Sequence, residues 1–444
     1  MSVIDSHIEA DVDRVSPGDL IQLATDTGPA PMQVGLILLL DPARPVSPAD
    51  VRTVLADRAS CVPRLRQRLM RVPFGCGRPI WVDDADFDVT RHVRPLACPP
   101  PADREALHAL ATDLVTQRLP MGRPLWSIAV TALADGTPAL IAVMHHVVAD
   151  GIGGLALLGQ LVDGVTVNGG TTSRDFPRAA PSAWRLLSDA TLARVRALQH
   201  LPSGVRRLVD GVSELRPGSG TSAHVCSLNR RTGPQRKMLV LHTDLSAVRG
   251  SGHANGATVN DVVLTAVTGA LGCLLLRRGE RVDSLVVSVP VAAPRPSGAS
   301  MLGNRVGVMP VRLPTGGEPG DRLRAVAAVT REHKRARRGA SEALVAPAIR
   351  AMAALGLLQP AINRQRAVNT FVTDLRGPTH RLAVLGSQIT DIAAVPGLAG
   401  NVTVSFAALS YAGTLTVTIL VDPDRWPDLT ALAQDLQAEL DALT

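Results

Sequence analysis

The chain has 444 residues, more than a single growing hydrophobic core normally accommodates, so two domains are expected. Its formal net charge is +7, but most of the basic residues are scattered arginines, and aromatic residues make up only 2% of the chain, which argues against a nucleic-acid-binding surface. An anionic membrane surface or a phosphorylated substrate fits this charge.

The cysteines and the N-terminus predict a cytoplasmic protein. Cys61, Cys76, Cys98, Cys226 and Cys273 are far apart and lack the spacing of a disulfide framework or a metal site, so no bound metal is expected. The first residues are acidic and polar rather than those of a signal peptide, and no apolar run reaches the roughly 20 residues that span a bilayer. Contact with a membrane or lipid droplet is therefore expected to be peripheral.

The first third of the chain predicts alternating strands and helices. Residues 31–40 form a short apolar run that is typical of a buried strand, and a helix is expected to open at 47–50. Residues 81–89 resemble strand and turn pieces. Residues 103–118 carry a helical period.

A hairpin is the clearest local feature. The apolar strands 125–133 and 139–146 are joined by the turn at Asp135 and Gly136. An Ala/Leu-rich helix is expected over 152–162, so His145 and His146 stand where a strand ends and a loop leads to a helix.

Composition divides the rest of the chain. Residues 166–223 are rich in Gly, Thr, Ser, Pro and Arg around a helical piece at 184–201, and this indicates a crossover between a first domain, 1–165, and a second, 224–444. In the second domain we expect strands at 236–241, 285–291, 306–313, 402–408 and 415–420, and helices at 258–276, 321–338 and 427–443.

The histidine pair carries the strongest chemical signal. Transfer of an acyl group to a hydroxyl needs a base that is neutral near pH 7, accepts the alcohol proton and returns it to the leaving group, and imidazole suits this role. Side chains alternate across a strand, so His145 and His146 are expected to face opposite sides. One is then the base and the other is structural, unless both are merely buried polar residues that close the strand.

Asp150 and Gly151 complete the motif. Asp150 either orients a histidine or holds its loop through an arginine or backbone amides, and its place in a tight turn favours the second role. Adjacent histidines on a strand rarely converge on one metal ion. No serine or cysteine stands in a nucleophile elbow, which favours direct transfer over a covalent acyl-enzyme.

These residues form an HHxxxDG motif, which resembles that of the bacterial wax ester synthase/diacylglycerol acyltransferase family. The resemblance spans essentially the whole chain, although the sequence departs from the family pattern at 292–295 and 372–376. Further segments resemble the family in the same order: Pro124-Leu125-Trp126, Ser227-Leu228-Asn229, Thr258-Val259-Asn260-Asp261, Val289-Pro290-Val291, Leu302-Gly303-Asn304 and Arg376-Gly377-Pro378.

The resemblance implies an α/β fold of two chloramphenicol-acetyltransferase-like halves, also found in condensation domains. Their mixed sheets are flanked by helices, and an active-site tunnel lies at their interface. It further implies that His146 is the general base and that Asp150 is structural and paired with an arginine, for which Arg295 is a candidate. Acyl-CoA would be the co-substrate, with no bound cofactor.

The same resemblance brings other residues to the tunnel. Asn260 is expected to stabilise the thioester oxygen or position the hydroxyl, although an Asn near the start of an apolar helix is also a common N-cap. Gly154 is expected to allow close approach of substrate. Substrate contacts are also expected for Trp126, Asp261 and Asn304.

Several functions remain open at this point. The resemblance favours esterification of diacylglycerol to triacylglycerol, with long-chain alcohols as further acceptors that would give wax esters. An HxxxxD acyltransferase would instead make His145 the base. A condensation-type enzyme acting on another hydroxyl or amine, and a catalytically silent lipid-binding relative, are the alternatives.

Two segments are candidates for contact with anions or lipid. The basic run 331–338 fits CoA phosphates or an anionic membrane, but such runs are more often solvated helix faces. Residues 343–362 suit an apolar helix that either touches a bilayer or belongs to the core.

Overall fold

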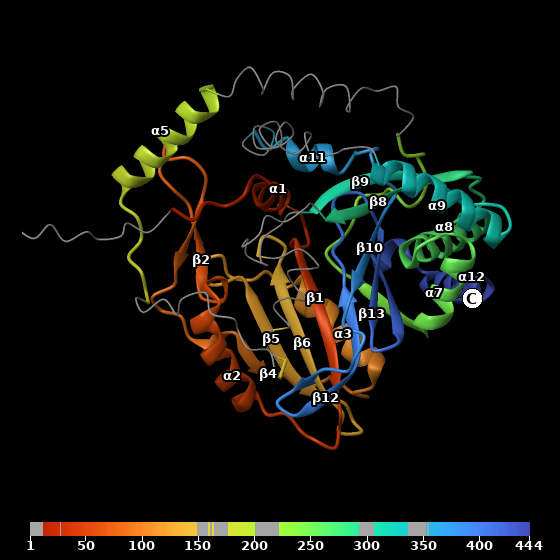
Figure 1. The fold of residues 1–444 in the computed structure, drawn as a ribbon, viewed down its shortest axis with the longest axis horizontal. Helices are drawn as coiled ribbons and strands as arrows, with labels where there is room; N and C mark the ends of the chain where they lie inside the picture. The colour runs from red at the N-terminus through yellow and green to blue at the C-terminus, as the bar shows by residue number, and fades with distance from the viewer. Residues whose placement is uncertain are drawn as a thin grey trace, which may run out of the picture.

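Two six-stranded sheets, each covered by helices, make up the computed structural model (Figure 1). The structure describes residues 12–26, 28–148, 159, 162–163, 176–199, 222–292, 306–335, 352 and 355–444. Both sheets are mixed, because each contains parallel as well as antiparallel neighbours. The expected fold of two mixed α/β halves is therefore confirmed.

The first sheet has the strand order β11-β12-β1-β6-β5-β4. Its strands are β1 (Gln33–Leu40), β4 (Val93–Pro95), β5 (Trp126–Ala132), β6 (Pro138–His145), β11 (Ala383–Val384) and β12 (Ser387–Val395). The predicted hairpin is β5 and β6, and Gly136 takes the positive φ of 85° that its turn requires. β1 reads as a continuous apolar run because it is buried on both faces: Leu36 and Leu38 face one core cluster, and Ile37 and Leu39 face another.

Helices and a small ribbon surround this sheet. They are α1 (Pro17–Thr25), α2 (Pro48–Cys61), α3 (Arg104–Thr116) and α5 (Ala183–Gln199), with the ribbon of β2 (Gln67–Met70) and β3 (Ile80–Asp83). α2 begins where the sequence predicts, because the Ser47 side chain accepts from the Asp50 amide and Pro48 occupies the first turn.

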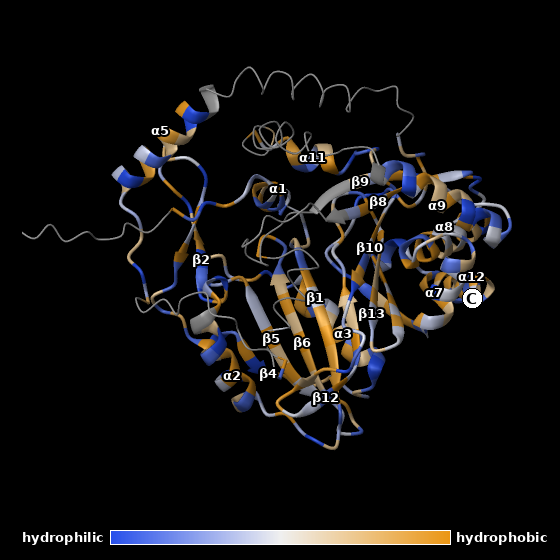
Figure 2. Ribbon diagram, viewed as in Figure 1, coloured by the Kyte–Doolittle hydropathy of each residue, from blue (hydrophilic) through white to orange (hydrophobic). Residues whose placement is uncertain are grey.

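The second sheet has the order β7-β14-β13-β10-β8-β9. Its strands are β7 (Lys237–Asp244), β8 (Ser284–Ala292), β9 (Val306–Pro314), β10 (Thr370–Arg376), β13 (Val404–Tyr411) and β14 (Thr414–Val421). The helices of this half are α7 (Leu245–Ala254), α8 (Val259–Arg277), α9 (Pro319–Arg335) and α12 (Leu429–Leu443), whereas the short α11 (Leu358–Ile362) contacts α1 of the first half. Hydropathy colouring places apolar residues along the strands of both sheets (Figure 2).

α8 is the one helix in the described part of the chain that is long and apolar enough to cross a membrane. Its most apolar 18-residue window is 72% buried, and its side chains pack with α12, α9 and the second sheet. α8 is therefore the central helix of the second half.

The division of the chain at residue 224 needs correction. β11 and β12 belong to the later part of the sequence, yet β12 pairs antiparallel with β1 in the first sheet. Local sequence patterns do not encode the partner of a strand, since pairing is decided by contacts far along the chain. Because β10 and β13 both belong to the second sheet, the excursion through β11 and β12 adds two covalent connections between the halves.

The apolar segment 343–362 is not one continuous helix, because it is interrupted near its C-terminal end. Gly356 has a φ of 69°, and the Leu357 amide donates to Met352 O at 2.8 Å, which ends a helical turn there. α11 then begins at Leu358. Residues 343–351, 353 and 354 of this predicted helix, and residues 336–338 of the basic run, lie outside the described residues.

Candidate active site

The two histidines lie at the end of β6, where backbone bonds fix each of them. The His145 amide donates to Leu125 O at 3.0 Å, and the His146 amide donates to Met32 O at 2.8 Å. His145 is only 1% exposed, whereas His146 is half-buried in the turn that follows the strand. The pair therefore presents one sealed imidazole and one that is partly accessible.

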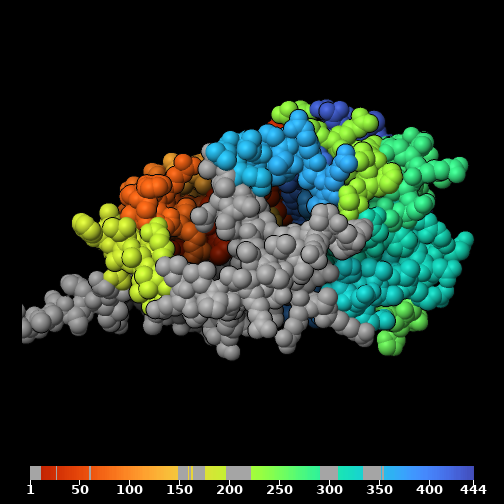
Figure 3. Space-filling model, turned by 90° about the horizontal axis from the view of Figure 1, so that it is seen from above, coloured from red at the N-terminus to blue at the C-terminus, as the bar shows by residue number. Residues whose placement is uncertain are grey.

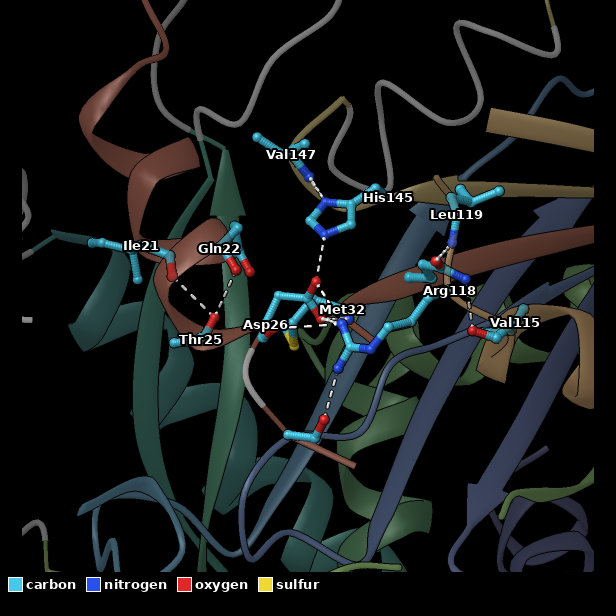
Figure 4. A network of polar contacts seen from close by, with 12 residues as sticks. Ile21, Gln22, Thr25, Asp26, Met32, Val115, Arg118, Leu119, His145 and Val147 are labelled. Carbon is cyan, nitrogen blue, oxygen red and sulfur yellow. Dashed lines mark hydrogen bonds and ion pairs between the residues drawn. The ribbon is translucent and has the colours of Figure 1, made fainter. Parts of the chain in front are cut away.

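The ring of His145 is held at both nitrogens (Figure 4). Nδ1 accepts from the Val147 amide at 3.1 Å, and Nε2 lies 3.3 Å from Oδ2 of Asp26. Because Nδ1 acts as an acceptor, the proton sits on Nε2, which donates to the carboxylate. These two bonds hold the ring of His145 in place beside the turn that carries His146.

Asp26 is the hub of this network. It is the C-cap residue of α1, an unfavourable place for a carboxylate because the helix dipole is negative there. Its oxygens accept from the Met32 amide at 2.8 Å and from Arg118 Nη1 at 2.9 Å. Burial by itself raises the pKa of the Asp26 carboxyl, but the bonds from His145 and Met32 and the charge of Arg118 hold it below its usual value.

Gln33 fixes the position of Arg118. Its buried side chain donates to Val115 O at 2.8 Å and Gln117 O at 2.9 Å, and it accepts from the Leu119 amide at 2.8 Å. Gln33 also pairs with His145 across β1 and β6. The end of α3, the end of α1 and the histidine turn are thus joined through side chains.

Sequence reasoning missed Asp26, Gln33 and Arg118. An aspartate near a helix end has no distinctive pattern, and α1 itself was not predicted. A buried Gln in an apolar strand is the one local signal, because an amide there needs hydrogen-bond partners.

Trp126 lies within the first half. It is 2% exposed, its indole Nε1 donates to Leu65 O at 2.7 Å, and its ring stacks on His92 with centroids 4.5 Å apart. Burial lowers the pKa of His92, which keeps that ring neutral. These contacts are structural, so a contact of Trp126 with substrate stays a prediction.

The start of α8 differs in detail from expectation. The N-cap is Thr258 rather than Asn260, and Asp261 closes a capping box with it. The buried Asp261 carboxylate also accepts from Thr330 Oγ1 of α9 at 2.7 Å, so its described contacts cap α8 and join it to α9. Asn260 is half-buried in the first turn of α8, and its catalytic role stays a prediction.

Five residues of the predicted site lie outside the described residues. They are Asp150, Gly151, Gly154, Arg295 and Asn304. Within the described part of the chain, no cluster of His, Cys, Asp and Glu has the arrangement of a metal site.

A cleft of about 720 Å³ lies between the two halves. Asp391 of β12 lines it and accepts from Arg104 of α3 and from His242 of β7, each at 3.0 Å. Asp391 pairs with Leu39, six residues along β1 from Gln33, the partner of His145. At ~3.3 Å per residue the cleft is roughly 20 Å from the histidine end of the sheet, so a tunnel that reaches His146 stays a prediction.

Comparison with known proteins gives consistent matches. Residues 15–263 match the family described as wax ester synthase/diacylglycerol acyltransferase catalytic domain, and residues 302–444 match the WS/DGAT C-terminal domain. A probable diacylglycerol O-acyltransferase of Mycobacterium tuberculosis is 33% identical over 443 residues, covering 96% of this chain and 91% of the relative.

Solved structures show the same fold. A wax ester synthase/diacylglycerol acyltransferase from Marinobacter aquaeolei VT8 superposes with a TM-score of 0.68 at 21% identity, covering 97% of this chain and 98% of that one. The starter condensation domain of rhizomide synthetase, solved as a mutant in complex with C8-CoA, gives a TM-score of 0.63 at 15% identity over 97% of this chain and 95% of that one.

Proposed function

The chain belongs to the wax ester synthase/diacylglycerol acyltransferase family of acyltransferases, and on that premise we propose that it moves an acyl group from acyl-CoA to diacylglycerol. The products are triacylglycerol and free CoA. Long-chain alcohols are further acceptors and give wax esters. The names of the matching family and of the mycobacterial relative support this acceptor class, and the condensation-domain complex with C8-CoA supports the donor.

In this proposal His146 is the general base. Its imidazole takes the proton of the acceptor hydroxyl while the oxygen attacks the thioester carbonyl. The carbon–sulfur bond then breaks, and the imidazolium returns the proton to the departing CoA sulfur. The acyl group passes directly to the acceptor, so no covalent enzyme intermediate forms.

The observation that carries this assignment is the different setting of the two rings. His145 is buried and uses both nitrogens to hold Asp26 and Val147, so it has no nitrogen left for a substrate proton. His146 is half-buried beside it, and its backbone is fixed on one side by Met32. This favours His146 over the HxxxxD alternative, in which His145 is the base.

The oxyanion requires a donor in addition to the base. Asn260 is our candidate, because its amide is half-buried in the first turn of α8 rather than used as the cap. A preorganised donor of this kind supplies ~3 kcal/mol of transition-state stabilisation. Asn260→Asp, which keeps the side-chain shape but removes the amide donor, is the matched variant.

An acceptor panel tests the proposal. Purified full-length protein is incubated with labelled palmitoyl-CoA and with diacylglycerol, hexadecanol or an amine, and both the labelled product and free CoA are measured. We expect triacylglycerol with stoichiometric CoA release, and loss of both in His146→Ala. Product with the amine alone would point to a condensation-type enzyme, and no CoA release with any acceptor would favour a silent lipid binder.

A further inference from the structure

The outer face of α5 exposes apolar side chains to solvent. Trp184, Leu187, Leu192 and Val195 are all exposed. At ~100° per residue these four positions fall within one arc of about 140° on the helix. An isolated exposed leucine is ordinary, but a continuous apolar stripe on the solvent side of a helix indicates a binding surface.

The opposite face of α5 is anchored to the protein, so this orientation is fixed. Leu186 and Ala190 are buried, and Leu186 packs in a small core with β3. Asp189 accepts from Arg14 Nε at 2.6 Å, and Arg14 also donates to Leu186 O at 2.9 Å. Because these contacts bury the opposite face of α5, the apolar arc points away from the protein.

A second apolar element stands beside α5. Phe74 is fully exposed at the tip of the loop 71–78, and Arg194 of α5 donates to Gly75 O of this loop at 2.7 Å. Aromatic residues are scarce, with only four Trp, one Tyr and five Phe in the chain. Trp184 is 81% exposed, whereas the other three tryptophans are at most 5% exposed. The most exposed Trp and the most exposed Phe thus occur on adjacent segments.

Positive charge borders the apolar arc. Arg185 and Arg196 lie along one side of it and Arg194 along the other, and Arg71 is exposed in the Phe74 loop. The loop 71–78 contains no acidic residue, and the only one on α5 is Asp189, which pairs with Arg14. Aromatic and aliphatic side chains bordered by arginines match the boundary between acyl chains and anionic headgroups.

This face is on the same side of the molecule as the candidate active site. In Figure 1, α5, α1 and α11 occupy the upper side, toward which β6 runs and ends at His145. The view from above shows α5 together with the segment around α11 (Figure 3), and that segment exposes Leu355 and Leu357. α5 thus lies toward the end of the molecule at which β6 ends.

We propose that α5 and the Phe74 loop form the surface on which the protein lies against an anionic phospholipid layer. The apolar arc enters the acyl boundary and the arginines contact the phosphates. A second copy of the chain fits less well, because a symmetric contact would bring two arginine-bordered faces together. The expected peripheral membrane contact is thereby assigned to α5 and the Phe74 loop.

The protein carries its own probe for this proposal. Because Trp184 is the only exposed tryptophan, its emission dominates any solvent-dependent change in fluorescence. We expect vesicles of phosphatidylcholine with about a third phosphatidylglycerol to shift that emission to the blue and protect it from acrylamide, and brominated lipids to quench it. Pure phosphatidylcholine should bind more weakly, and added salt should weaken binding to the anionic vesicles.

Variants that keep Trp184 separate the contributions. Phe74→Ser with Leu192→Ser should weaken vesicle co-sedimentation by roughly tenfold, and Arg196→Gln by roughly fivefold. Leu276→Ser, at an exposed leucine on α8, is the matched control and should bind as the wild type does. His146→Ala should also bind normally, which separates this proposal from the catalytic one.

Two outcomes would overturn the proposal. One is equal vesicle binding by the wild type and the Phe74→Ser/Leu192→Ser variant. The other is a wild type that does not bind vesicles but forms a dimer. If the Phe74→Ser/Leu192→Ser variant loses that dimer, the face is a contact between two copies of the chain. Thermal unfolding of each variant checks that its fold is intact.

Discussion

Nε2 of His145 lies 3.3 Å from Oδ2 of Asp26, although 119 residues separate the two in the chain. The bond connects the end of α1 to the turn that carries His146, and the Val147 amide holds the same ring from the other side. The accessible imidazole is thus positioned by its buried neighbour. His145 acts as a positioning residue, and its effects on stability and on rate can be separated.

Replacing His145 should lower the free energy of unfolding more than it lowers the rate of acyl transfer. His145→Ala takes one donor from the Asp26 carboxylate, which keeps Met32 and Arg118, and removes the acceptor of the buried Val147 amide, so we expect a loss of about 2 kcal/mol in the free energy of unfolding. Asn keeps the acceptor for Val147 and Gln keeps a donor for Asp26, so each should recover about 1 kcal/mol. Urea denaturation measures these values, and equal stability of His145→Ala and wild type would contradict the network.

Asp26 should give stability a specific dependence on acid. Its pKa lies below the ordinary value of 3.8, so its stabilising contribution is complete above that value and is lost as the pH falls through the lower folded pKa. As the pH falls below about 4, unfolding free energy should fall more steeply in the wild type than in Asp26→Asn. The control is Asp86→Asn at an exposed position, which should keep the wild-type slope.

Asp391 and His242 should couple the two halves. The bond between them joins β12 of the first sheet to β7 of the second at 3.0 Å, but both groups are partly exposed to solvent. A double-mutant cycle with Asp391→Asn and His242→Gln should therefore give a coupling free energy of about 1 kcal/mol at most. Additive effects of the two changes would show that the bond does not contribute to the docking of the halves.

Gly269 should not tolerate a side chain. A Cβ at this position in α8 would overlap the buried Arg322 guanidinium and its ion-pair partner, the Glu439 carboxylate. We expect Gly269→Ala to destabilise the protein by about 3 kcal/mol. Gly250 of α7 has open space around its Cβ position, so Gly250→Ala should be neutral or stabilise by about 0.5 kcal/mol. Thermal unfolding of the pair compares them directly.

Local patterns found the elements whose signals are local. The β5 and β6 hairpin, the capped start of α2 and the long apolar α8 follow from turn residues, caps and periodicity. β12 was missed because its sequence, SQITDIAAV, has no regular alternation of polar and apolar residues, and its partner lies some 350 residues earlier on β1.

The part of the candidate site that has a local sequence signal was predicted, and the part that depends on distant contacts was not. Strand alternation separates His145 from His146, and the structure accordingly gives them different burial. The residues that hold His145 come from α1 and the end of α3, and nothing within either segment marks them as neighbours. The assignment of proton transfer to His146 is a chemical prediction that geometry supports and kinetics must test.

The most direct test compares single-turnover rates of acyl transfer from palmitoyl-CoA to diacylglycerol in His146→Gln and His145→Asn. Gln at 146 keeps a polar side chain of similar reach but cannot relay a proton, so we expect a loss of about 10³-fold or more. His145→Asn keeps the acceptor for Val147 and should retain more than about a tenth of the wild-type rate. A larger loss at His145 than at His146 would contradict the assignment of the base.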